Sequence, residues 1–162
     1  MAEQLPVQEI IRHIRSQFRD GQPNGWLQNW DESRLFTQVS IAAAPHEVLN
    51  CTTFDYAFCN WYEIPISTGH NDWILTIKLS FIVPAYCMYW TEHDTVTGGS
   101  VAPIAPMGYQ NLEDKVRFAA ESAGLFELPS EWHDHEVQGV TLDLSNTSNV
   151  TIDKCLFCDH DN

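Results

Sequence analysis

The residues best suited to chemistry in this chain are two cysteines near the end of the sequence. Cys155 and Cys158 are separated by two residues, a spacing that can chelate zinc or support thiol exchange. His133 and His135 would complete a set of two sulfur and two imidazole ligands. However, the apolar residues between the cysteines indicate a strand, on which residues three apart point to opposite faces. We therefore predict no metal and no cofactor, with the zinc site as the alternative.

A second set of residues could support nucleophilic catalysis. Cys51 would be the nucleophile, His70 the base, and Asp72 or Asp55 the group that orients the base. The threonines and aromatic residues after Cys51 favour a strand, and no oxyanion-stabilising element is recognisable. We interpret Cys51 as a small core residue and predict no catalytic residue. A small cysteine- or zinc-dependent hydrolase remains the alternative function.

A third set of residues could supply a general acid and a general base. His93 lies between Glu92 and Asp94 at the end of an apolar segment, where a general acid and base could be placed. The same residues are ordinary polar residues at the end of a strand, and this is the interpretation we favour.

The fourth set is the segment 130–136, in which acids and histidines surround Trp132. An aromatic side chain ringed by negative charge is typical of a hot spot that binds a basic protein. The alternative is that Trp132 covers the core at a connection between two elements. The predicted partner-binding residues are Glu131, Trp132, Asp134, Glu136, Asp159 and Asp161.

The charge of the chain supports a basic partner. The 162 residues include 22 acids and 8 Lys and Arg residues, which gives a formal net charge of −14. Residues 121–162 hold nine of the acids and a single lysine, Lys154. Because 12% of the residues are aromatic, we expect a folded protein rather than a disordered acidic tail. Its negative field should repel nucleic acid and anionic membranes and attract basic proteins.

Other features of the sequence restrict the cellular compartment and the type of chemistry that we expect. The start of the chain lacks the basic and apolar regions of a signal peptide, and no apolar stretch is long enough for a membrane span. The five cysteines are an odd number, which favours reduced thiols in the cytoplasm. We find no phosphate-binding glycine loop, no HExxH, no GxSxG and no EF-hand loop.

Apolar periodicity predicts one globular α+β domain over residues 1–162. A helix is expected over residues 7–19 and another over 112–123, both packed on a mostly antiparallel sheet of about five to seven strands. The expected strands are 36–43, 52–66, 73–83, 85–91, 136–144 and 149–157. Residues 95–107 are rich in Gly and Pro and predict a surface loop.

In size, charge and aromatic content the chain resembles bacterial immunity proteins, although no motif carries this resemblance. Such proteins inhibit toxins, often basic nucleases, by covering the active site with an acidic surface. We therefore predict an acidic protein-binding module, with an inhibitor of the immunity type that neutralises a basic toxin as the most specific hypothesis. An exposed edge after Pro84, or at the final strand, could instead serve homodimerisation.

Overall fold

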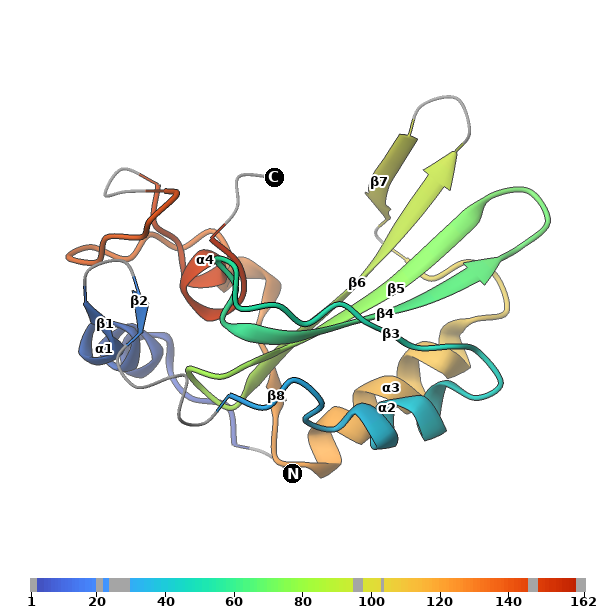
Figure 1. Cartoon of the computed structure of the whole chain (residues 1–162), viewed down its shortest axis with the longest axis horizontal. Helices are drawn as coiled ribbons and strands as arrows, with labels where there is room; N and C mark the ends of the chain where they lie inside the picture. The colour runs from blue at the N-terminus through green and yellow to red at the C-terminus, as the bar shows by residue number, and fades with distance from the viewer. Residues whose placement is uncertain are drawn as a thin grey trace.

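The computed structural model describes residues 3–19, 22–23, 30–94, 98–102, 104–145 and 149–159. They form the predicted α+β fold, with helices packed on a mostly antiparallel sheet (Figure 1). The helices are α1 (Val7–Gln17), α2 (Phe36–Ala43), α3 (Gln110–Ser122) and α4 (Ile152–Leu156), with a 3-10 turn at Ser130–Trp132. The main sheet contains β3 (Leu49–Asn50), β4 (Cys59–Ser67), β5 (Asp72–Ser80), β6 (Ala85–Asp94), β7 (Gly98–Ala102) and β8 (Phe126–Glu127).

The sheet is a meander to which one parallel strand is added. Strands β3 to β7 are antiparallel neighbours in the order of the sequence. Strand β8 pairs in parallel with the first residues of β6, whereas β7 pairs with its last five residues. A separate hairpin joins β1 (Phe18–Arg19) to β2 (Gln22–Pro23).

Successive strand residues point to opposite faces, and this divides the core into two clusters. Tyr62, Ile64 and Ile66 of β4 point to the face covered by α2 and α3. Cys59 of the same strand points to the opposite face, where α1 and α4 cover only one end of the sheet. Figure 1 shows this arrangement, with α2 and α3 side by side and α1 and α4 in a lobe at the other end. In the described part of the chain, no helix covers the rest of the second face.

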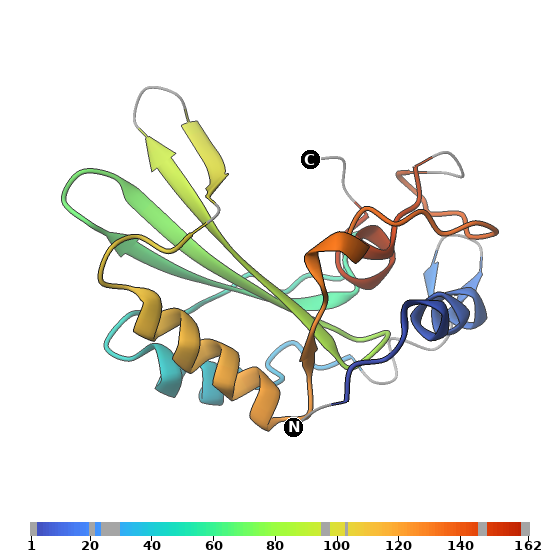
Figure 2. The same cartoon turned by 180° about the vertical axis from the view of Figure 1, so that it is seen from behind.

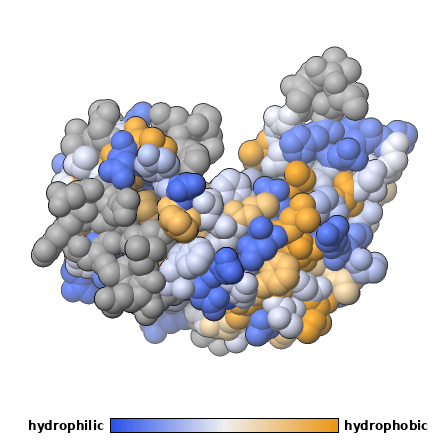
Figure 3. Space-filling view, in the orientation of Figure 1, coloured by the Kyte–Doolittle hydropathy of each residue, from blue (hydrophilic) through white to orange (hydrophobic). Residues whose placement is uncertain are grey.

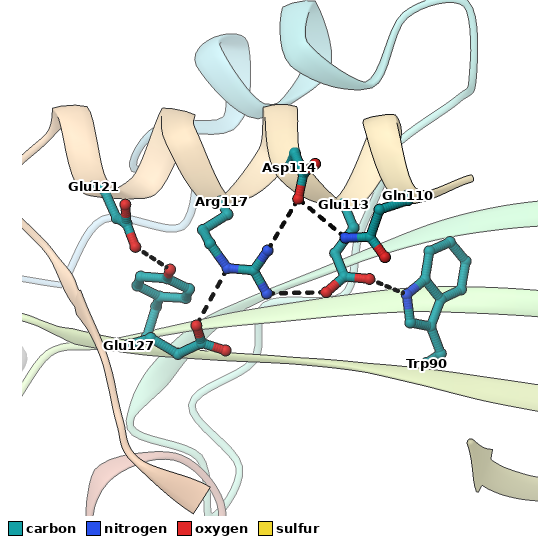
Figure 4. A network of polar contacts seen from close by, with 8 residues as sticks. Trp90, Gln110, Glu113, Asp114, Arg117, Glu121 and Glu127 are labelled. Carbon is teal, nitrogen blue, oxygen red and sulfur yellow. Dashed lines mark hydrogen bonds and ion pairs between the residues drawn. The ribbon is translucent and has the colours of Figure 1, made fainter. Parts of the chain in front are cut away.

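Helix α3 is fixed to the sheet by a polar network (Figure 4). Arg117 binds the carboxylates of Glu113, Asp114 and Glu127 at 2.9, 3.4 and 3.2 Å. The indole nitrogen of Trp90 donates to Glu113 at 3.0 Å. Because Glu127 belongs to β8, the network also joins α3 to that strand.

The prediction of a strand over residues 36–43 is wrong, because this segment is the helix α2. Phe36, Val39 and Ala43 have the spacing of one helical face, and Val39 and Ala43 are completely buried against α3 and the sheet. Ile41 would share a face with Val39 on a strand, but it is 72% exposed. The apparent alternation of polar and apolar residues therefore concealed a helical pattern.

The predicted strands at 136–144 and 149–157 are also wrong. A single antiparallel bridge joins Glu136 to Thr151, and α4 begins immediately afterwards. The Thr151 side chain caps this helix by accepting from the amide of Lys154 at 3.3 Å. Ile152, Cys155 and Leu156 then share one buried helical face.

The remaining differences concern the boundaries of elements. Residues 52–58 precede β4 without forming a strand, and β7 lies within the expected loop 95–107. The helices at 7–19 and 112–123 are confirmed as α1 and α3. In the described part of the chain, no helix has the length and the apolar character needed to cross a membrane.

Candidate partner-binding groove

A groove with a volume of about 1130 Å³ lies at the outer edge of β6. Within the described residues, β8 ends its pairing at Tyr86 and β7 begins its pairing at Trp90. The backbone of Cys87 to Tyr89 therefore has no strand partner on this side, and these residues line the groove. The two walls of the groove are formed by β7 and by the segment that follows β8, and Figure 2 shows the backbone of both beside β6.

The floor of the groove is formed by the uncovered face of the sheet. Lys78 of β5 lies opposite Trp61 of β4 and Cys87 of β6. Its ammonium nitrogen is 4.3 Å from the ring centroid of Trp61 and 5.4 Å from that of Tyr89. These contacts hold the only lysine of the groove lining against two aromatic rings.

One wall is acidic and is attached firmly to α4. Glu127, Asp134 and Asp153 line the groove. Nδ1 of His133 lies 2.6 Å from Oδ1 of Asp153, and the amide of Asp153 donates to the carbonyl oxygen of His133 at 3.1 Å. The wall therefore has a defined position relative to the sheet, which a preformed binding site requires.

Three thiols, those of Cys59, Cys87 and Cys158, lie close enough to Lys78 to interact with its charge. The Cys59 thiol is hydrogen-bonded to Cys158, which lowers the pKa of Cys158, and Lys78 lowers it further. Burial raises the pKa of Cys59, and the same hydrogen bond raises it further. Burial also raises the pKa of Cys87. Burial alone would lower the pKa of Lys78, but Cys158, Tyr89 and the other two thiols raise it overall. Lys78 therefore stays charged over the whole physiological range.

The predicted partner-binding residues have different environments. Glu131, Asp134 and Glu136 are exposed, and in the described part of the chain the ion pairs use other carboxylates. Trp132 is half-buried and packs against the core cluster of α1 and α4, so it anchors the segment that carries these acids. Figure 3 shows a hollow in the molecular surface between the lobe that contains α1 and α4 and the long strands of the sheet.

Asp159, near the end of the described chain, does not join this surface. Asp159 is completely buried and accepts hydrogen bonds from the amides of Leu144 and Ser145 at 2.7 and 3.1 Å. We therefore correct its assignment from a partner contact to a structural carboxylate. Asp161 lies outside the described residues.

The alternative catalytic residues are not brought together. Cys51 lies beside the start of β4, because its backbone amide donates a hydrogen bond to the carbonyl oxygen of Trp61. His70 lies in the turn beyond the far end of β4, about 20 Å away at the rise of an extended strand. Burial raises the pKa of Cys51, and Glu63 adds to this effect. Cys51 is therefore not an activated thiol.

The zinc alternative and the His93 set also lack the required geometry. Among the described residues, no group of three or more His, Cys, Asp and Glu side chains could hold a metal ion. His93 is exposed, and its ring lies against Gly99 of the neighbouring strand. Glu92 accepts from the Asn71 side-chain amide at 2.5 Å, so this carboxylate has a structural partner.

Sequence reasoning did not find the groove floor. Alternation along β5 places Lys78 on the same face as Thr76 and Ile74, but the residues opposite it depend on the strand register. That register brings Trp61 and Cys87 to Lys78. No family model, curated protein or solved structure matches this chain.

Proposed function

We propose that the chain is an acidic protein-binding module whose groove and adjoining 131–136 segment bind a basic protein. The observation that carries this proposal is the position of the unpaired acids. Asp134 lines the groove, and Glu131 and Glu136 are exposed on the same segment. The formal net charge of −14 extends the attraction over the whole molecule.

The groove supplies more than negative charge. The unpaired backbone of Cys87 to Tyr89 can hydrogen-bond to a peptide, and the Tyr89 ring offers an apolar surface. Asp134 and Asp153 are positioned to accept hydrogen bonds from an arginine or lysine side chain. A basic side chain of the partner would therefore enter the groove while the exposed acids contact its surroundings.

The more specific form of the proposal is an inhibitor of the immunity type that neutralises a basic toxin in the cytoplasm. Charge complementarity gives fast, salt-sensitive capture, which suits a protein that must reach its target before the target acts. The five cysteines, all present as thiols, agree with a reducing compartment.

The test begins with capture of a basic protein from native lysate at low salt, followed by purification of that protein. Its affinity is then measured for the wild type and for a Glu131→Ala, Asp134→Ala, Glu136→Ala variant. Three exposed charges at about 0.5 kcal/mol each predict about tenfold weaker binding and a flatter salt dependence.

A matched control removes three exposed acids that lie outside the groove lining, Glu32, Glu47 and Asp55. This control has the same net charge as the groove variant, so it should weaken binding only slightly. Equal losses in the two variants would show attraction by net charge alone and would remove the assignment to the groove.

A further inference from the structure

We propose that Cys158 and Cys59 form a redox-active dithiol that reacts with small-molecule disulfides. Cys158 is the attacking thiol, and Cys59 is the resolving thiol. The pair is independent of the proposed function, because neither sulfur is a contact for the basic partner.

The fold places the two thiols on the same face of one extended pair. Ala57 and Cys158 form an antiparallel bridge, in which the amide of Phe58 donates to Phe157 and the amide of Asp159 donates to Tyr56. Side chains two residues apart share a face, so Cys59 points to the same side as Ala57. Cys59 is therefore a diagonal neighbour of Cys158 in this pair, both residues belong to the same core cluster, and a hydrogen bond between the thiols contributes to the pKa shifts of both.

The surroundings distinguish the two sulfur atoms. Lys78 lowers the pKa of Cys158, because a neighbouring ammonium favours the thiolate, which is the nucleophilic form. Cys158 is 7% exposed, whereas Cys59 is completely buried. Of these two thiols, Cys158 is thus the one with residual exposed surface, and we assign it the reaction with the external reagent, after which Cys59 reacts from within the fold.

The other cysteines do not combine a lowered pKa with residual exposed surface. Cys155 is completely buried and burial raises its pKa. Cys51 is more accessible than Cys158, but its pKa is raised by burial and by Glu63. Cys87 lies opposite Lys78 on the neighbouring strand, yet burial raises its pKa. Among the cysteines of the described residues, a lowered pKa and some residual exposed surface therefore coincide at Cys158.

The reaction has two balanced steps. The Cys158 thiolate attacks one sulfur of an external disulfide, which forms a mixed disulfide and releases one thiolate. That thiolate takes the proton of Cys59, whose sulfur then attacks Sγ of Cys158 and expels the second thiolate. Two protein thiols are oxidised to one disulfide, and the external disulfide is reduced to two thiols.

The test treats the folded, reduced full chain with bis(2-hydroxyethyl) disulfide, a small neutral reagent, and maps the products by mass spectrometry. We expect a mixed disulfide at Cys158 that converts to a species two hydrogens lighter than the starting protein, with Cys59 joined to Cys158. In Cys59→Ser the mixed disulfide should accumulate, whereas Cys51→Ser should behave as the wild type.

Two further variants test the role of the ammonium. Lys78→Met should raise the pKa of Cys158 and slow its reaction at neutral pH, by about threefold for each pKa unit because nucleophilicity partly offsets the lost thiolate. Lys78→Arg should restore the rate. In the wild type, the pH profile of labelling at Cys158 should level off at lower pH than the profile at Cys51.

Several results would overturn the proposal. These are first modification at Cys51 or Cys87, a mixed disulfide that never resolves in the wild type, or a disulfide that joins another pair. Thermal unfolding of each variant shows whether it is folded. If Cys59→Ser is unfolded, the product map and the pH profile of the wild type still decide the question.

Discussion

The hydroxyl of Ser145 donates a 2.5 Å hydrogen bond to the carboxylate of Asp159. The same carboxylate accepts from two backbone amides, so the end of the described chain is fixed to the loop before residue 146. A carboxylate that is completely buried needs such partners, because an unpaired buried charge is strongly destabilising. Asp159 therefore contributes to the fold rather than to the acidic surface.

Replacing Asp159 by Asn should destabilise the protein by about 2–4 kcal/mol, because the new amide group donates and cannot accept from all three donors. Chemical unfolding measures this change. Asp143→Asn, at an exposed position in the same region, should stay within about 0.5 kcal/mol of the wild type. Equal unfolding midpoints for both variants would contradict the structural role.

Arg117→Met should destabilise the protein by about 1–3 kcal/mol, because three carboxylates would lose a cation that is 28% exposed. The measurement is the free energy of unfolding together with amide exchange in α3. Arg12→Met is the control, since Arg12 is 74% exposed and pairs with Glu9 of its own helix. Its effect should be within about 0.5 kcal/mol. A loss of the same size in both variants would argue against the network.

The assignment of residues 36–43 to a helix can be tested with two charged substitutions. Val39→Asp should cost about 3 kcal/mol or more, because Val39 is completely buried. Ile41→Asp should cost less than about 1 kcal/mol, because Ile41 is 72% exposed. On a strand the two side chains would share a face and the two costs would be similar. Thermal and chemical unfolding of both variants distinguish these outcomes.

The sequence predicted the elements whose apolar pattern is long and regular. Helix α1 and strands β4 to β6 were recognisable because one face of each is continuously apolar. Short elements were not, since α2 has 8 residues and α4 has 5, and few positions separate a helical period from an alternating one. The cap at Thr151 was the signal that could have identified α4.

Local pattern also predicted part of the candidate site. Glu131, Asp134 and Glu136 were found from their composition around Trp132, and the structure places Asp134 in the groove. Lys78 and the thiols could not be found in this way. Their proximity depends on strand register and on the packing of Cys158 against Cys59, which joins positions far apart in the sequence.

Backbone NMR with a short arginine-rich peptide tests most directly whether the groove binds basic protein segments. We expect salt-sensitive chemical-shift changes confined to β6 residues 87–89, the 127–134 segment and Asp153, and no such changes with an acidic peptide of equal length. Changes spread over Glu32, Glu47 and Asp55, or no changes at low salt and high peptide concentration, would contradict this expectation.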